Sequence, residues 1–112
     1  MTLTQLETLL AVAQAELLTD IGGTEISGCY LSDLLSDVLA HAPPGALWIT
    51  VQTHRNVVSV AATKDLAAVL FTGGRKPESA VVVEAEEQGI VLMTTPLSTF
   101  EVAGKIWEAG IR

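Results

Sequence analysis

The stretch from Ala67 to Pro77 reads AAVLFTGGRKP, an apolar run that stops at two glycines and continues with two cations and a proline. The segment 66–72 is short and almost wholly apolar, which predicts a strand buried on both faces of a sheet. Pro77 is expected at the first position of a helix, because its fixed φ suits that position and its missing amide proton is not needed there. Gly89 is the stop signal for this helix. The stretch therefore predicts a strand, a turn and a helix in succession.

The same alternation extends along most of the chain. We predict a first helix from a capping box at Thr4–Glu7 to about residue 15, then a short edge strand at 16–20 and a turn at 21–25. Further strands are expected at 26–31, 46–51, 66–72 and 90–95, and helices at 32–42, 54–65, 77–89 and 98–110.

Two of these helices need a separate argument. The segment 54–65 has valines that suit a strand, but its length and alanines suit a helix, and a helix leaves 66–72 free to be the next strand. Ser98–Glu101 is a second capping box, with Leu97 and Val102 placed to form a hydrophobic staple. Strand and helix alternation of this kind predicts a three-layer α/β/α domain with a parallel or mostly parallel sheet of about four or five strands.

The totals limit the class of protein. At 112 residues, positions 1–112 are expected to form a single domain. Thirteen acidic and six basic residues leave a net charge of −7, which disfavours binding to nucleic acid or to a membrane surface. The lone Cys29 cannot form an internal disulfide, and no targeting segment or membrane-length apolar run is present, so a cytoplasmic protein is expected.

Polar and cationic side chains follow the ends of the predicted strands. Since ligands bind outside the carboxyl ends of parallel strands, where helix amino termini present free amides, these positions form a candidate site for a small anion or nucleotide. Arginine suits bidentate contact with a phosphate or carboxylate, and glycine allows close backbone approach. The alternative is that the serines cap helices, the glycines make a turn and the cations are solvated. The candidate ligand-binding residues are Ser32, Asp33, Thr53, His54, Arg55, Thr72, Gly73, Gly74, Arg75, Thr95 and Ser98.

Other kinds of site have little support. No GxxxxGKS, GxxxxGKT or GxGxxG pattern is present, which argues against a P-loop or a Rossmann dinucleotide site. One cysteine and two histidines without paired spacing argue against zinc, and no cofactor is expected. Cys29, His54 and Asp33 could share one sheet edge as nucleophile, base and orienting acid, which is the weakest of the alternatives. His41 is expected to stabilise a helix carboxyl end, and Trp48 and Trp107 are expected in the core or in a dimer contact.

Several quoted segments resemble the DRTGG domain family. They are LFTGGRKP at 70–77, THRNVV at 53–58, TTPLSTFEVAGKI at 94–106 and the run GCYLSDLLSDVLAHAPPGALWITVQTH at 28–54. Thr72, Gly73 and Gly74 match the family's Thr-Gly-Gly, and Arg55 matches its arginine, whereas His54 stands where an aspartate is usual. The likeness extends from about Leu18 over most of the chain and is greatest to stand-alone members of the family.

The resemblance implies an α/β domain similar to the amino-terminal domain of HPr kinase/phosphorylase, with a regulatory or dimerising role. Such domains accompany nucleotide-sensing CBS domains in some pyrophosphatases. Kinase activity is not expected, because the kinase's P-loop lies in a different domain. We therefore expect a non-catalytic regulatory or sensor module that binds a small anionic ligand such as a nucleotide, as a homodimer. The alternatives are a ligand-free dimerisation or protein-interaction module and an enzyme that uses Cys29 and His54.

Overall fold

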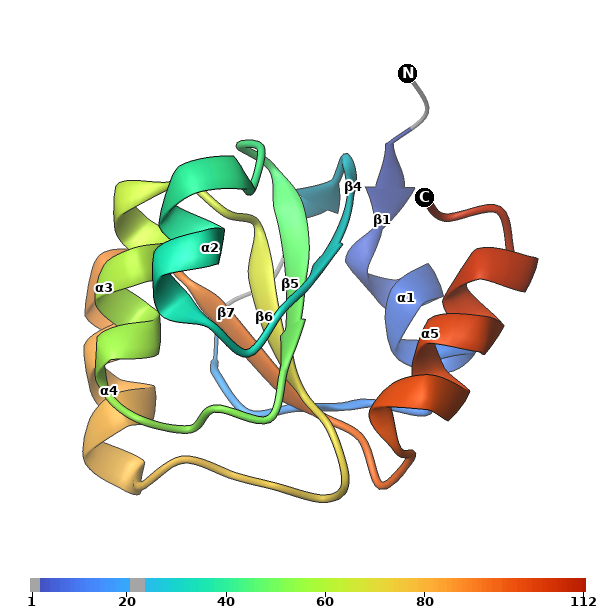
Figure 1. Cartoon of the computed structure of the whole chain (residues 1–112). Coiled ribbons are helices and arrows are strands. Elements are labelled where there is room, and N and C mark those ends of the chain that lie inside the picture. Colours follow the sequence, from blue (N-terminus) through green and yellow to red (C-terminus); the bar gives the residue numbers. More distant parts are fainter. Residues whose placement is uncertain (1–2, 21–23) are drawn as a thin grey trace.

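A five-stranded sheet runs through the centre of the molecule, between two layers of helices (Figure 1). The computed structural model describes residues 3–20 and 24–112. The sheet contains β2 (Glu16–Leu17), β4 (Gly28–Leu31), β5 (Ala46–Thr50), β6 (Ala68–Phe71) and β7 (Val91–Thr94). Its strand order is β2-β7-β6-β5-β4. The strands β4 to β7 are parallel, and only β2 is antiparallel to its neighbour. The predicted three-layer fold with a mostly parallel sheet is confirmed.

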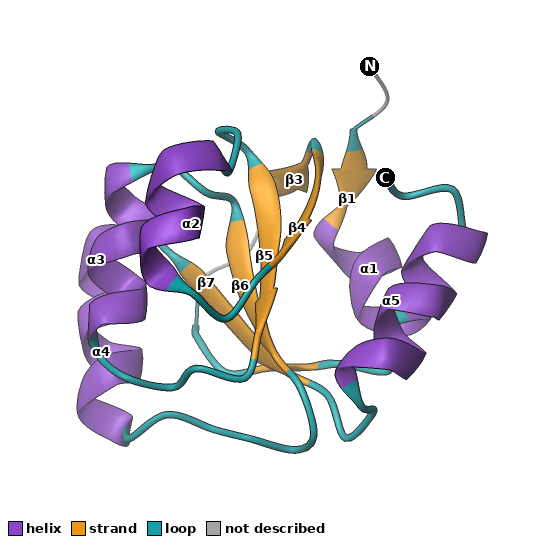
Figure 2. Cartoon of the chain, in the orientation of Figure 1, coloured by secondary structure: helices purple, strands orange, loops and turns teal. Residues whose placement is uncertain are grey.

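In the described part of the chain, three helices cover one face of the sheet and two cover the other (Figure 2). The first layer contains α2 (Leu35–His41), α3 (Asn56–Thr63) and α4 (Ser79–Gln88), which follow β4, β5 and β6 respectively. The second layer contains α1 (Leu6–Val12) and α5 (Thr99–Glu108). Because β4 to β7 run in the same direction, their carboxyl ends all lie at one edge of the sheet.

Alternate side chains of each central strand enter two separate cores. On β5, Trp48 packs toward α2, α3 and α4, whereas Leu47 and Ile49 pack toward α1 and α5. On β6, Phe71 belongs to the first core and Leu70 to the second. This two-residue period is what a strand buried on both faces requires. Trp48 is fully buried, as predicted, and its Nε1 donates a hydrogen bond to the Ser32 carbonyl at 2.7 Å.

The predicted amino-terminal capping box is wrong. Thr4 and Gln5 form β1, which pairs antiparallel with β3 (Glu25–Ile26) in a small second sheet. The backbone therefore stays extended through Gln5, and α1 begins at Leu6 without a side-chain cap and ends at Val12. The predicted strand at 26–31 is likewise divided between β3 and β4, and residues 21–23 of the predicted turn lie outside the described residues.

The start of α4 differs from its prediction, whereas the end of α4 and the start of α5 agree with theirs. The helix α4 begins at Ser79 with Glu78 as its N-cap, so Pro77 precedes the helix. In the connection before α4, Thr94 Oγ1 donates to the Arg75 carbonyl at 2.6 Å, which ties this segment to the end of β7. Gly89 ends α4 with a φ of 73°, and Ser98 and Glu101 form the predicted capping box of α5. In the described residues, no helix is long and apolar enough to span a membrane.

Candidate ligand-binding site

A cleft of about 550 Å³ opens at the carboxyl ends of β5 and β6, between the start of α3 and the first turns of α4. The segment 51–55 forms one wall, and the other wall is formed by Lys76, Glu78, Ala80, Val81 and Glu84. Asp33 holds the end of β5 in place, because its Oδ1 accepts hydrogen bonds from Thr50 Oγ1 at 2.9 Å and from the Val51 amide at 2.8 Å. Asp33, which follows β4, thus positions the cleft wall that follows β5.

The loop between β5 and α3 brings Thr53, His54 and Arg55 to the cleft. The Asn56 amide donates to His54 Nδ1 at 3.1 Å, so the neutral imidazole carries its proton on Nε2. His54 can therefore offer a hydrogen-bond donor to a ligand without being charged. Arg55 is the residue before the first turn of α3, and the three side chains supply a hydroxyl, an imidazole N–H and a guanidinium.

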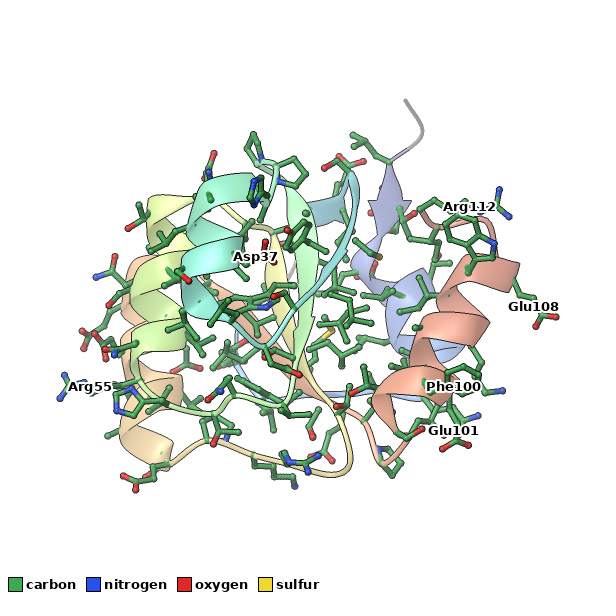
Figure 3. All side chains as sticks on the ribbon, in the orientation of Figure 1. Asp37, Arg55, Phe100, Glu101, Glu108 and Arg112 are labelled. Carbon is green, nitrogen blue, oxygen red and sulfur yellow. The ribbon has the colours of Figure 1, made fainter. Side chains whose placement is uncertain are left out.

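Each cation of the cleft has a carboxylate partner at the outer limit of ion-pair distance. Arg55 Nη2 lies 3.8 Å from Glu84 Oε2, and Lys76 Nζ lies 3.9 Å from Glu16 Oε2. The Arg55 side chain is 71% exposed and points away from the sheet beside α3 and α4 (Figure 3). Formally, Arg55 and Lys76 balance Glu78 and Glu84, so the cleft is nearly neutral in a strongly acidic protein.

Two helix amino termini lie at the cleft, those of α3 and α4. The first amide of α3 donates to His54 Nδ1, whereas the N-cap residue of α4, Glu78, makes no side-chain hydrogen bond. At the start of α4, the Ser79 and Ala80 amides donate to no acceptor in the described part of the chain. Unpaired first-turn amides and the positive end of the helix dipole favour an anion. They add neutral donors to the wall that carries Lys76, opposite Arg55.

The Thr-Gly-Gly segment is a tight turn beside the cleft. Gly73 and Gly74 have φ values of 66° and 72°. Their amides donate to the carbonyls of Leu97 and Thr95, each at 2.7 Å, and Arg75 Nη1 folds back to donate to the Thr72 carbonyl at 3.1 Å. The glycine amides of the turn therefore donate their hydrogen bonds to the connection between β7 and α5.

Three other predicted hydroxyls, those of Thr72, Thr95 and Ser98, contact the other layer of helices or the segment that leads to it. Thr72 Oγ1 lies 2.7 Å from Thr99 Oγ1, and Thr95 Oγ1 donates to the Ala13 carbonyl at 2.7 Å. Ser98 caps α5. This follows from strand alternation, because Phe71 points toward α3 and α4, so that the next residue points toward α5. Residues at neighbouring strand ends are thus divided between two faces.

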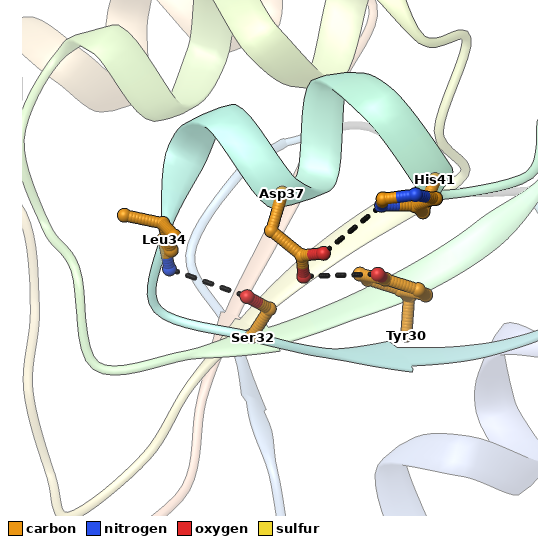
Figure 4. A network of polar contacts seen from close by, with 5 residues as sticks. All are labelled: Tyr30, Ser32, Leu34, Asp37 and His41. Carbon is orange, nitrogen blue, oxygen red and sulfur yellow. Dashed lines mark hydrogen bonds and ion pairs between the residues drawn. The ribbon is translucent and has the colours of Figure 1, made fainter.

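A second polar cluster lies between β4 and α2 (Figure 4). Tyr30 Oη donates to Asp37 Oδ2 at 2.9 Å, and His41 Nδ1 lies 3.1 Å from Asp37 Oδ1. Hydrogen bonds from the hydroxyl of Ser32, then from Tyr30, and the contact with His41 lower the pKa of Asp37 from its ordinary value. Ser32 Oγ also accepts a hydrogen bond from the Leu34 amide at 3.2 Å. His41 lies near the carboxyl end of α2, as predicted.

Cys29 and His54 do not come together. Cys29 packs against the core that includes Leu47 and Ile106, beside a second cavity of about 180 Å³ between β4 and α5, whereas His54 lines the cleft at α3 and α4. Burial raises the pKa of Cys29 to about 11, which leaves little thiolate near neutral pH. Among the described residues, the predicted arrangement of Cys29, His54 and Asp33 is not formed.

Of the candidate residues, the structure brings Thr53, His54 and Arg55 together in the cleft. Sequence reasoning left out Glu78, Val81 and Glu84, which line the opposite wall. These residues belong to the start and the cleft-facing side of α4, and no motif marks them. A helical projection of residues 77–89 shows which residues share a face, but it does not show which face lies beside α3.

The DRTGG domain family matches residues 9–109 of the chain. Comparison with curated proteins finds no match. A similar solved structure is that of the CBS and DRTGG domains of the regulatory region of Clostridium perfringens pyrophosphatase, complexed with its activator, diadenosine tetraphosphate. The TM-score is 0.73 at 17% identity, and the match covers 92% of this chain and 46% of the pyrophosphatase chain.

Proposed function

The chain belongs to the DRTGG domain family, and from this membership and the cleft we propose that residues 1–112 are a single non-catalytic regulatory domain. In this proposal the domain acts in the cytoplasm and binds a small anionic ligand such as a nucleotide between α3 and α4. Thr53, His54 and Arg55 contact the ligand. The other candidate residues of the carboxyl edge hold the loops that shape the site.

The cleft is the observation that carries this proposal. Its volume of about 550 Å³ is within the usual size range for small-molecule sites, about 300–1,000 Å³. Arg55 and Lys76 supply positive charge, His54 supplies a neutral donor, and the uncapped start of α4 supplies free amides. Donors of this kind suit phosphate or carboxylate groups. The pyrophosphatase regulatory region, which also contains a DRTGG domain, was crystallised with a dinucleoside polyphosphate, and this lends support to a nucleotide as ligand.

The proposal is tested by thermal unfolding in the presence of ATP, diadenosine tetraphosphate and inorganic pyrophosphate. A ligand at about 100 times its Kd stabilises the folded protein by about 2.7 kcal/mol, which shifts the Tm by several degrees. Arg55→Ala should remove this shift. Lys105→Ala should retain it, since Lys105 is an exposed cation on α5 in the other layer. Unchanged Tm values with all three compounds would count against the proposal.

A homodimer or protein-interaction module is the second candidate, favoured by exposed aromatic side chains on α5. Phe100 is 88% exposed and Trp107 is 61% exposed, and Phe100 lies on the outer side of this helix (Figure 3). Exposed aromatic side chains are typical of contact surfaces. Light scattering at micromolar concentration should give a dimer mass for the wild type and a monomer mass for Trp107→Ala. A monomeric wild type would exclude the homodimer.

A further inference from the structure

The ion pair between Arg55 and Glu84 is a loose contact. Its distance of 3.8 Å exceeds the roughly 2.7–3.2 Å of an N–H···O hydrogen bond. In the described residues Arg55 donates no hydrogen bond, whereas Arg75 donates one to the carbonyl of Thr72. The Arg55 side chain is 71% exposed, but that of Glu84 is only 32% exposed and is fixed to α4. The guanidinium is therefore free to change partner, and the Glu84 carboxylate lines the cleft wall.

We propose that Glu84 is an internal competitor for the anionic group of the ligand. In the free protein its carboxylate attracts Arg55, and on binding a phosphate or carboxylate of the ligand takes over the guanidinium. This inference rests on the proposed function, because it concerns the same cleft. It assigns to Glu84 the role of lowering the affinity of the cleft for anionic ligands.

The chemistry of the groups supports the competition. A carboxylate and a phosphate accept hydrogen bonds from a guanidinium in the same way, so a phosphate that binds the Nη2 hydrogens facing Glu84 takes the place of the carboxylate there. A ligand that makes two short charge-assisted bonds gains more than Glu84 does at 3.8 Å. Glu84 also repels any anion that approaches Arg55, so an anion must make short hydrogen bonds to bind there.

A purely structural role for the pair has different consequences. If Glu84 serves to tie α4 to the start of α3, then its removal lowers the free energy of unfolding and leaves ligand affinity unchanged or reduced. If Glu84 competes with the ligand, its removal changes stability little, because exposed ion pairs contribute little, and binding becomes tighter.

The experiment is isothermal titration of pyrophosphate and of ATP into the wild type, Glu84→Gln and Glu78→Gln at constant ionic strength. Glu84→Gln should lower the Kd about two- to five-fold, the range that loss of one exposed ion pair allows. Glu78→Gln is the matched control, since it removes a carboxylate from the same cleft without an ion-pair contact to Arg55. The double variant Arg55→Ala with Glu84→Gln should lose the gain.

The outcomes separate this inference from the proposed function. If the wild type binds a probe and Arg55→Ala weakens binding, but Glu84→Gln leaves the Kd unchanged or raises it, the site stands and the competitor role is wrong. An equal gain in Glu78→Gln would also overturn it, because a general charge effect would then suffice. If neither the wild type nor any variant binds either probe, both proposals fail.

Discussion

Replacing Gly74 by alanine should destabilise the protein through its backbone conformation alone. Gly74 has a φ of 72°, and an added Cβ would meet no atom within 4 Å. The cost is therefore that of placing an L-residue in the left-handed region, about 1–2 kcal/mol. For a domain of this size, about 1 kcal/mol corresponds to a Tm decrease of about 4–8 °C.

Gly73→Ala should cost more than Gly74→Ala for a reason that the structure identifies. Its φ is 66°, and its Cβ would in addition meet Arg75 Nη1, so the guanidinium must give up its hydrogen bond to the Thr72 carbonyl. Combining Gly73→Ala with Arg75→Ala should remove this excess. Gly74→Asn should retain more stability than Gly74→Ala, because asparagine tolerates a positive φ better than alanine does.

Differential scanning calorimetry of these variants, with and without pyrophosphate, provides the test. The turn is expected to act on folding, so Gly74→Ala should lower the Tm with and without ligand and leave the ligand-dependent shift unchanged. A Gly74→Ala protein with the Tm of the wild type and no ligand-dependent shift would refute the reasoning. The glycine amides would then be contacting the ligand in place of the Thr95 and Leu97 carbonyls.

Three further measurements test other parts of the structure. Thr95→Val should cost about 1–3 kcal/mol in urea unfolding, because it leaves the buried Ala13 carbonyl and Leu97 amide without their hydroxyl partner; a loss under about 0.5 kcal/mol would contradict this. The pKa of Asp37 is lowered in the folded protein, so its carboxylate stabilises the fold above the ordinary pKa of 3.8 and loses this effect as the pH falls through the folded-state pKa. The urea midpoint should therefore fall more between about pH 6 and about pH 3 in the wild type than in Asp37→Asn. Equal falls would contradict the assignment. Cys29, with its pKa raised from 9.0 to about 11, should react with iodoacetamide at about pH 8 roughly 100-fold more slowly than an unperturbed thiol, and a rate equal to that of free cysteine would contradict its burial.

Part of the candidate site follows from the positions of polar residues after the strands. The sequence located the edge correctly, because each polar segment follows a strand of a parallel sheet. It could not show which residues at this edge face α3 and α4 and which face α1 and α5. Thr53 and Arg55 line the cleft, but Thr72 and Thr95 face α5 and α1, since side-chain direction at a strand end depends on where the strand stops. A shift of one residue reverses that direction.

The sequence by itself determined the layered fold, the mostly parallel direction of the strands, the end of α4 at Gly89 and the capping box at Ser98. These features depend on local periodicity, glycine conformation and hydrogen bonds between residues close in the chain. Only the tertiary structure decided that Thr4 and Gln5 pair with β3, that the glycine amides bond to the β7–α5 connection and that Glu84 lies beside Arg55. Those contacts join residues far apart in the chain, and their geometry is set by how the helices pack on the sheet.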